Sequence, residues 1–373
     1  MKILALCLLL FLVGCTVDTP QTPNNSISPD IIPEEDKSLF HEFEEEALRM
    51  LENMTIEDKI GQIFLARCPE DENLSLYLSM KPGGFIMFGR DFTGKTKEEV
   101  VNKINYYQEN SDIPMIIGVD EEGGTVVRVS SNPNLAAKRF KSPQELYNIG
   151  GFEEIIRDTN EKSKLLKSLG INLNLNPIAD VSTNAEDFIF SRSFGKTAEE
   201  TAEYVKFVVE TAKENNISST LKHFPGYGNN VDTHTGSAYD ERAYEEFLSS
   251  DFIPFEAGID AGAESILISH NIVKSLDAEN PASLSKKVID ILRNDMEFTG
   301  IIMTDDLSMG AVSETASPEV MAVLSGNDML IVSDLEASYN SLLAAVTNKD
   351  ISEDRINESV LRIIKWKYYL GLI

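Results

Sequence analysis

Gly300-Ile301-Ile302-Met303-Thr304 is a short, nearly continuous apolar run that ends directly at two acids, Asp305 and Asp306. Such a run predicts a β-strand that is covered on both faces, as in a parallel sheet. The acids would then follow the carboxyl end of that strand, which is where barrel enzymes place their chemistry. The fold depends on how often this pattern of strand, polar end and helix recurs.

The pattern recurs eight times along the chain. The predicted strands are Ile60–Arg67, Gly84–Phe88, Met115–Val119, Ile171–Ile178, Ile217–Lys222, Ser265–Ser269, Gly300–Thr304 and Asp328–Val332. The predicted helices are Lys97–Asn110, Glu153–Leu169, Ala198–Asn215, Tyr244–Ala261, Lys286–Met296, Tyr339–Val346 and Glu353–Tyr369. Eight alternations predict an α/β fold, a (β/α)8 TIM barrel with a single catalytic domain. No G-x-G-x-x-G follows a strand, so a dinucleotide-binding sheet is not favoured.

Polar residues follow several of the predicted strands. The candidates are Asp120 and Arg128 after the third strand, Asn176, Asp180 and Arg192 after the fourth, Lys222 and His223 after the fifth, His270 at the end of the sixth, and Asp305 and Asp306 after the seventh. The carboxyl ends of barrel strands meet at one rim, so we expect these acids, bases and cations to converge there.

The loop Lys222–His234 carries two of the four histidines of the chain. Its proline and glycines exclude a regular helix or an inner strand. In an extended loop Asp232 and His234 would point the same way, because side chains alternate with a period of two. A carboxylate beside an imidazole fixes the tautomer and favours the charged form, which suits proton transfer. A polar surface turn with a chance histidine is the alternative interpretation.

Composition limits the classes of partner. The chain has 373 residues, 42% of them hydrophobic, which is enough for a sizeable core. Its formal net charge of −28 argues against binding nucleic acid and against electrostatic adhesion to anionic lipid. Membrane contact would therefore have to come from a lipid anchor.

The start of the chain predicts such an anchor. Lys2 supplies a positive end, and Ile3–Val13 is almost wholly apolar but too short to span a bilayer. The stretch Leu12–Cys15 resembles the bacterial lipoprotein box, which implies cleavage before Cys15 and lipid on its sulfur. The protein would then be exported and held on the periplasmic or extracellular face of the cell membrane or outer membrane. An ordinary secretory signal with an incidental cysteine is the alternative.

These features divide the chain into three parts. We expect a lipoprotein signal peptide over 1–14, a lipidated flexible tether over 15–35 and the barrel over 36–373. After cleavage only Cys15 and Cys68 remain, so no internal disulfide is expected despite export. Cys68 is interpreted as a half-buried packing residue.

Three segments, in this order and at these positions of the barrel, resemble glycoside hydrolase family 3, and specifically its bacterial β-N-acetylhexosaminidase branch. They are Asp120–Arg128, Lys222–His234 and Thr304–Met309, and the ending Arg355–Leu372 is also typical of that branch. The resemblance covers the body from about Met54 to Ile373. It implies a retaining exo-β-N-acetylglucosaminidase that removes terminal β-linked N-acetylhexosamine from peptidoglycan fragments or related glycans, without a metal or an organic cofactor.

The resemblance also implies roles for particular residues. Asp305 matches the nucleophile, which forms a covalent glycosyl-enzyme, and His234 matches the general acid/base, oriented and charged by Asp232. The residues that match positions binding the hydroxyls and acetamido group of the terminal sugar are Asp120, Arg128, Arg192, Lys222 and His223. For Asp306 we expect a carboxylate that starts a helix. His270 is expected to form a wall of the pocket and not to act as a catalyst.

The chemistry leaves two alternatives open. Hydrolysis with retention needs an ionised carboxylate on one side of the sugar and a proton donor on the other. A histidine acid becomes neutral when it gives up its proton, so it repels an anionic leaving group or acceptor less than a carboxylate would. This suits the lactyl carboxylate of muramic acid, and it also permits a glycoside phosphorylase. The second alternative is a surface lipoprotein that binds sugar without turnover.

The chain departs from its apparent relatives at two places. Relatives usually have His-Gly where this chain has Tyr227-Gly228, and one more residue precedes their Asp-x-His pair. The shorter spacer, Asn229–Val231, would change how far His234 reaches toward the scissile bond. Glu121 stands where glutamine is usual, and it is expected to add negative charge near the sugar site.

Overall fold

The computed structural model describes residues 38–230, 233, 236 and 238–373. The predicted signal peptide, Cys15, the tether, Asp232 and His234 lie outside the described residues. Within the described part, no helix is both long enough and apolar enough to cross a membrane.

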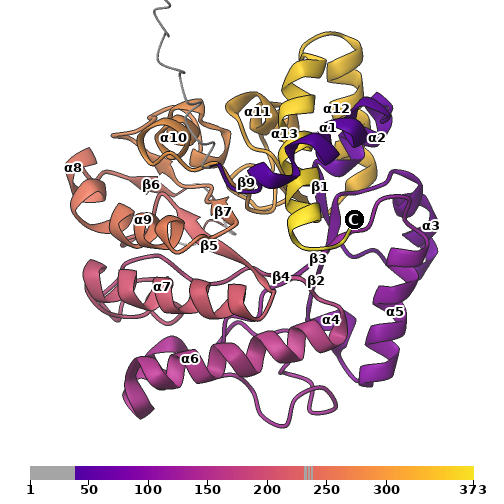
Figure 1. Ribbon diagram of the computed structural model, residues 1–373. Helices are drawn as coiled ribbons and strands as arrows, with labels where there is room; N and C mark the ends of the chain where they lie inside the picture. Colours follow the sequence, from indigo (N-terminus) through magenta and orange to yellow (C-terminus); the bar gives the residue numbers. More distant parts are fainter. Residues whose placement is uncertain (1–37, 231–232, 234–235, 237) are drawn as a thin grey trace, which may run out of the picture. The chain divides into compact units, whose positions relative to one another are not determined.

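Eight parallel strands form the centre of the described body, in the order β10-β1-β2-β3-β4-β5-β7-β9 (Figure 1). They are β1 (Phe64–Arg67), β2 (Gly84–Met87), β3 (Ile116–Val119), β4 (Leu173–Asn174), β5 (Ser218–Phe224), β7 (Ser265–Ile268), β9 (Ile301–Thr304) and β10 (Leu330–Val332). A parallel bridge between Met303 and Met329 brings the two ends of this order together, so that the sheet nearly closes. The predicted (β/α)8 barrel is confirmed.

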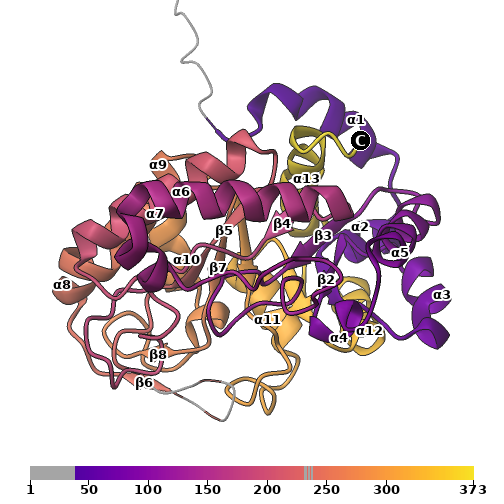
Figure 2. The same ribbon diagram turned by 90° about the horizontal axis from the view of Figure 1, so that it is seen from below.

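Helices surround the barrel in the order of the sequence, as the colours in Figure 1 show. They are α1 (Glu44–Glu52), α2 (Ile56–Gln62), α3 (Asp71–Ser79), α4 (Gly89–Phe92), α5 (Lys97–Glu109), α6 (Pro143–Leu169), α7 (Ala198–Glu214), α8 (Tyr244–Glu246), α9 (Phe252–Asp260), α10 (Lys286–Asp290), α11 (Pro318–Ser325), α12 (Leu335–Thr347) and α13 (Glu353–Tyr369). Short 3₁₀ or π segments are η1 (His41–Phe43), η2 (Phe247–Asp251), η3 (Ala282–Leu284) and η4 (Ile291–Asp295). A separate parallel pair, β6 (Tyr239–Asp240) and β8 (Ile272–Val273), lies in the loops that follow β5 and β7 (Figure 2).

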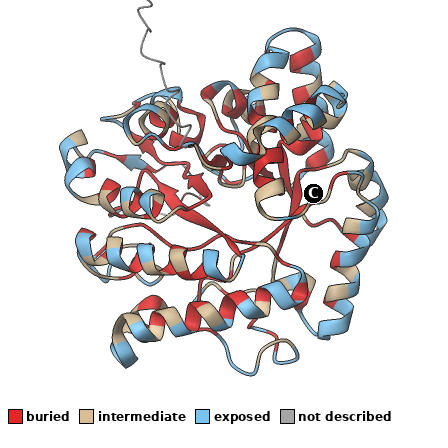
Figure 3. Ribbon diagram, viewed as in Figure 1, coloured by how far each residue is buried: buried red, intermediate tan, exposed pale blue. Residues whose placement is uncertain are grey.

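The interior of the barrel is filled by apolar side chains from alternating strands, such as Leu65, Ile86 and Leu267. Helix α13 closes the amino-terminal end, because Ile363 and Trp366 belong to the same buried cluster and the Trp366 indole donates to Ser218 Oγ at the start of β5. Figure 3 shows the strands buried and the outer faces of the helices exposed. With one end closed, the carboxyl ends of the strands are left to form the functional rim.

Most of the predicted strands are one or two residues shorter in the structure, and the first and fourth differ more. The first half of Ile60–Arg67 belongs to α2, which Thr55 caps by accepting a hydrogen bond from the backbone N–H of Asp58. The fourth strand contains only Leu173 and Asn174, because Pro177, joined to Asn176 by a cis peptide bond, has no N–H for a ladder.

Two further expectations need correction. Helix α6 begins at Pro143, ten residues before the predicted start, because Ser142 and Glu145 form a capping box and the helix continues through a kink at Gly150 and Gly151. Cys68 is fully buried and not half-buried. Its thiol lies 3.0 Å from the Tyr107 hydroxyl, and burial raises the pKa of Cys68 to about 12.

Candidate active site

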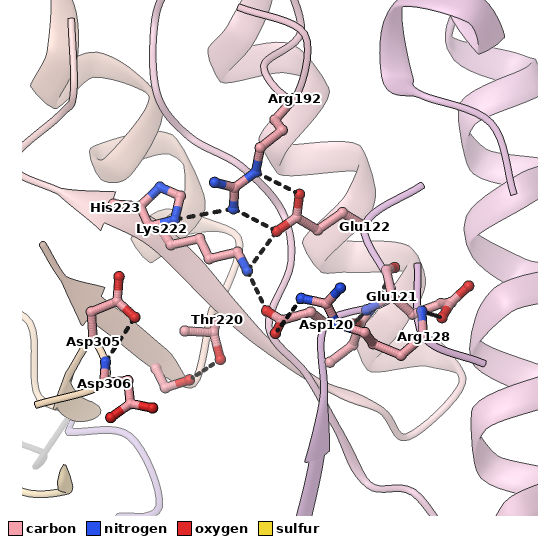
Figure 4. Close-up of polar contacts among 12 residues, drawn as sticks. Asp120, Glu121, Glu122, Arg128, Arg192, Thr220, Lys222, His223, Asp305 and Asp306 are labelled. Atoms are coloured by element: carbon pink, nitrogen blue, oxygen red, sulfur yellow. Dashed lines mark hydrogen bonds and ion pairs between the residues drawn. The ribbon is translucent and has the colours of Figure 1, made fainter. Parts of the chain in front are cut away.

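A cavity of about 460 Å³ opens at the carboxyl end of the barrel strands. Its charged lining consists of Arg67, Asp120, Glu122, Arg128, Arg192, Lys222, His223, Asp305 and Asp306, and its apolar lining includes Ile86, Phe88, Val126, Leu175, Leu267, Met309 and Ile331. The cavity thus brings together all five predicted sugar-binding residues and the predicted nucleophile. Figure 4 shows most of these charged side chains facing one another.

A network of ion pairs connects the loops after β3, β4 and β5. The Lys222 ammonium lies 2.7 Å from Asp120 Oδ1 and 2.7 Å from Glu122 Oε1. The Arg192 guanidinium binds the same Glu122 carboxylate with two hydrogen bonds, from Nε at 3.1 Å and from Nη2 at 2.8 Å. Arg128 lies at the edge of the network, with Nη2 at 3.7 Å from Asp120 Oδ2.

The network keeps its members charged although they are buried. Burial opposes ionisation of Glu122, but the Arg192 and Lys222 cations hold its pKa well below its usual range. Burial likewise opposes the charge on Lys222, and the Asp120 and Glu122 carboxylates raise its pKa above its usual value. The cavity therefore presents fixed positive and negative groups, which suits hydrogen bonding to the hydroxyl groups of a polar ligand.

His223 is held in place by Asp180, which is completely buried. The Asp180 Oδ2 atom lies 2.7 Å from His223 Nδ1 and accepts from the His223 backbone N–H at 3.1 Å. This leaves Nε2 facing the cavity side, 3.3 Å from Arg192 Nη2. Asp180 thus orients the imidazole without lining the cavity itself, a positioning role that its place after the fourth predicted strand did not distinguish.

Asp305 follows β9 directly and lines the same cavity. Its Oδ1 accepts a hydrogen bond of 2.8 Å from the backbone N–H of Asp306. Burial opposes its ionisation, but the imidazoles of His270 and His223, that hydrogen bond and Lys222 together lower the pKa of Asp305. An ionised carboxylate is the form that a nucleophile needs.

Asp306 does not start a helix, contrary to the sequence-based expectation. Its carboxylate accepts from the backbone N–H of Ser308 at 2.9 Å and from Ser333 Oγ at 2.8 Å, which stabilises a turn. Helix α11 begins only at Pro318. The chain after Asp306 continues as an irregular loop, of which Ser308, Met309 and Gly310 line the cavity.

His270 is buried and is not part of the cavity lining, so the expectation that it forms a wall of the pocket is wrong. Its Nδ1 lies 2.7 Å from Ser283 Oγ and its Nε2 lies 3.0 Å from the backbone oxygen of Asp306. Its imidazole contributes to lowering the pKa of Asp305.

Glu121 does not line the cavity. It is fully buried, and its carboxylate accepts from the backbone N–H groups of Arg128 and Val129, both at 2.7 Å, as well as from Ser130. Its role is to shape the loop that positions Arg128.

Sequence reasoning missed two cavity residues. Glu122 is the centre of the ion-pair network, and its spacing of two residues from Asp120 on an extended segment could have indicated that both point the same way. Arg67 could have been found in a similar way, because it is the last residue of β1 and so lies at the rim. Its guanidinium lies 4.7 Å from the centre of the Phe88 ring and lines the cavity. Its Nε atom is buried and has no hydrogen-bond partner among the residues that the structure describes.

The predicted pair Asp232 and His234 lies outside the described residues. Thr233, which lies between them in the sequence, is described and is buried in the loop that follows β5.

Known proteins include relatives that match much of this chain in sequence. A secreted glycosyl hydrolase from Arthroderma benhamiae, itself uncharacterized, is 28% identical over 79% of this chain and 87% of that protein. A β-hexosaminidase from Xylella fastidiosa strain M23 is 32% identical over 61% of this chain and 68% of that protein.

A solved structure of a family 3 β-N-acetylglucosaminidase from Paenibacillus sp. FPU-7 superposes with a TM-score of 0.80 and 28% identity, over 86% of this chain. The present chain spans 63% of the length of that protein. Residues 55–366 match the model of the glycosyl hydrolase family 3 N-terminal domain. The chain therefore belongs to glycosyl hydrolase family 3, a family of glycosidases.

Proposed function

We propose that this protein is a retaining exo-β-N-acetylglucosaminidase that acts on peptidoglycan fragments or related glycans. The observation that carries the proposal is the position of Asp305. An acid with a lowered pKa lines the same 460 Å³ cavity as a cluster of charged groups suited to binding the hydroxyls of one sugar. The names of the β-hexosaminidase from Xylella fastidiosa and the β-N-acetylglucosaminidase from Paenibacillus support the substrate class.

In the proposed reaction, the Asp305 carboxylate attacks the anomeric carbon and the bond from that carbon to the leaving oxygen breaks. His234, charged by Asp232, protonates the leaving oxygen as the covalent glycosyl-enzyme forms. The neutral His234 then takes a proton from water, which attacks the anomeric carbon and releases Asp305. This sequence uses two inversions and so retains the β configuration.

The terminal sugar would be bound by the groups that surround Asp305. Asp120 and Glu122 can accept hydrogen bonds from sugar hydroxyls, and Lys222, Arg192 and Arg128 can donate to sugar oxygens or to the acetamido carbonyl. Because these groups already bind one another, little rearrangement is needed when substrate enters. Fixed donors and acceptors of this kind stabilise charge as it develops in the transition state.

Export with a lipid anchor at Cys15 is part of the proposal. It rests on the signal-like start of the chain and on the secreted relative from Arthroderma benhamiae. The anchor would hold the barrel of residues 36–373 at a membrane through the tether 15–35. Metabolic labelling with a palmitate analogue tests it, since Cys15→Ser should abolish the label and leave the activity of the barrel unchanged.

The test of the activity is hydrolysis of a chromogenic N-acetylglucosaminide. Asp305→Ala should lower kcat by at least about 10³-fold, because it removes the nucleophile. A matched control is Asp334→Ser, which removes an exposed acid after β10 but keeps a side chain able to cap α12. The control should keep wild-type rates, and equal rates for the wild type and Asp305→Ala would reject the proposal.

Added phosphate distinguishes hydrolysis from phosphorolysis in the same assay. N-acetylglucosamine as the main product at all phosphate concentrations supports the hydrolase. Accumulation of N-acetylglucosamine 1-phosphate would show that the protein is a phosphorylase. Binding of the sugar without any turnover would identify a sugar-binding lipoprotein instead.

A further inference from the structure

Tyr227 connects the sugar-binding side of the cavity to the loop that follows it. Its backbone N–H donates to Asp180 Oδ1 at 2.7 Å, and Asp180 also binds the His223 ring. The Tyr227 ring meets the His223 ring edge to face, with centroids 5.1 Å apart and planes at 86°. The Tyr227 hydroxyl lies 2.5 Å from Thr233 Oγ1.

Thr233 is held from two directions. Besides the contact with the Tyr227 hydroxyl, its backbone oxygen accepts a hydrogen bond of 3.2 Å from the N–H of Ala311. Ala311 belongs to the segment that runs on from Asp305 and Asp306 along the cavity. Thr233 is completely buried at this junction, so both contacts are shielded from water. It thereby ties the loop after β5 to the loop after β9.

The backbone on either side of Tyr227 is tightly packed. Gly226 has a φ of +121°, and a Cβ there would lie 2.1 Å from Asp251 Oδ1. Gly228 has a φ of +52°, and a Cβ there would lie 2.4 Å from Arg242 Cζ. Both positions therefore require glycine, and the Arg242–Asp251 ion pair of 2.8 Å closes the packing around them. The backbone that carries Tyr227 is thus held in place, which fixes the position of the phenol hydroxyl beside Thr233.

We propose that Tyr227 and Thr233 are positioning residues for the acid/base step, a proposal that rests on the function proposed above. Thr233 is bonded directly to Asp232 and His234 in the sequence, the pair to which the proposed function assigns the proton transfer. Tyr227 contacts Asp180 through its backbone N–H, His223 through its ring and Thr233 through its hydroxyl, so it connects the sugar-binding residues to Thr233.

The test compares substrates that differ in their need for a proton. The leaving group of 2,4-dinitrophenyl N-acetylglucosaminide departs without protonation, whereas the leaving sugar of N,N′-diacetylchitobiose requires it. The value of kcat/KM reports the steps up to the glycosyl-enzyme. Tyr227→Phe and Thr233→Val should lower kcat/KM on the disaccharide about 10- to 100-fold, as expected for a misplaced catalytic group. On the dinitrophenyl substrate they should change it less than about threefold. Thr233→Ser, which keeps the hydroxyl, should restore most of the loss.

Tyr339→Phe is the matched control, because it also removes a buried phenol hydroxyl, one that donates to the backbone oxygen of Glu57 at 3.2 Å and does not line the cavity. It should leave both substrates unaffected. Equal losses on both substrates in Tyr227→Phe and Thr233→Val would show a purely structural role and overturn the proposal, as would no loss on either. Wild-type rates in Asp305→Ala, or a wild type without turnover, would instead reject the proposed function itself.

Discussion

Both ends of the barrel bury ionisable side chains, but these side chains differ in whether a partner of opposite charge lies beside them. At the carboxyl end, Glu122 and Lys222 are buried against each other and their pKa values move toward the charged forms. At the amino end, Lys367 has no exposed surface and burial lowers its pKa to about 7. Near the start of β7, burial raises the pKa of Glu264 to about 7.

The difference lies in the partners and not in the degree of burial. Lys367 Nζ donates to the neutral amide of Gln62 at 2.7 Å, and Glu264 accepts from the backbone N–H of Ser219 at 3.0 Å. Asp328 confirms this, since it is buried near the amino end of β10 but bound by Arg293 and by Arg362 at 3.0 Å. Burial opposes its ionisation, yet the arginines lower its pKa. A partner of opposite charge, and not the end of the barrel, therefore decides whether a buried group is held in its charged form.

Removing the central charge of the cavity should have the largest effect. Glu122→Gln leaves the buried Arg192 without its anionic partner, and Lys222 keeps only Asp120. We expect the free energy of unfolding to fall by about 3 kcal/mol and kcat/KM to fall by at least about 10²-fold. Urea denaturation and the chromogenic assay measure the two effects.

The control for that variant is Glu70→Gln, which breaks the exposed ion pair with Arg90 near β1. It should change stability by less than about 0.5 kcal/mol, because exposed pairs contribute little. A loss in Glu122→Gln no larger than in this control would contradict the view that the cavity network is held by mutual pairing.

The Glu264 carboxyl should make stability fall as the pH rises. Its pKa is about 7 in the folded protein and near 4.5 in the unfolded chain, so between these values the folded state binds more protons. The stability is complete below pH 4.5 and is lost as the pH rises to 7, by about 3 kcal/mol for this group alone. Glu264→Gln should lack this dependence. Parallel curves for the wild type and the variant over pH 4.5 to 7.5 would exclude a perturbed Glu264.

Lys367 should act in the opposite direction and at higher pH. Its pKa is about 7 when folded and about 10.5 when unfolded, so the folded state binds fewer protons in this window and stability rises with pH. Lys367→Met removes the cost of the buried ammonium but leaves Gln62 Oε1 unpaired. We expect a net gain of about 2 kcal/mol at pH 7 that shrinks toward pH 10.

Lys365→Met is the matched control for Lys367→Met. Its ammonium lies two residues away on α13 and binds the Glu44 carboxylate at 2.6 Å. Because this lysine has an anionic partner, its substitution should not stabilise the protein at pH 7. If both variants gained stability equally, the lack of an anionic partner for Lys367 would not explain the gain.

The sequence predicted the barrel because each strand is a separate apolar run and the longer helices, such as α5, α7 and α13, begin at a capping side chain. Helix α13 was predicted with its observed bounds of Glu353–Tyr369, since Ser352 caps its start. The predictions failed where a boundary depends on tertiary contacts. The run Ile60–Arg67 is largely apolar, and its composition does not separate the helical residues at its start from the strand that follows.

The site was predicted at the level of which residues share the rim, because strand ends meet there by topology. The cavity lining confirms that Asp120, Arg192 and Lys222 converge. The role of each acid could not be predicted from its residue type. Glu121 and Glu122 are adjacent and identical, but one binds backbone N–H groups and the other binds two cations. Their roles depend on which way each side chain points and on residues far away in the chain.

The smallest effect is expected where a charge pair is exposed. Lys286 and Asp290 form an ion pair of the i,i+4 type on α10, with 69% and 41% of their side-chain surface exposed. Water solvates both groups in the folded and unfolded states, so Lys286→Gln should change the free energy of unfolding by at most about 0.5 kcal/mol. Raising the salt concentration should reduce even this difference, because exposed charges are screened. A loss comparable to that of Glu122→Gln would mean that pairing alone, without burial, sets the energy of a charge in this protein, and the contrast between the two ends of the barrel would need another cause.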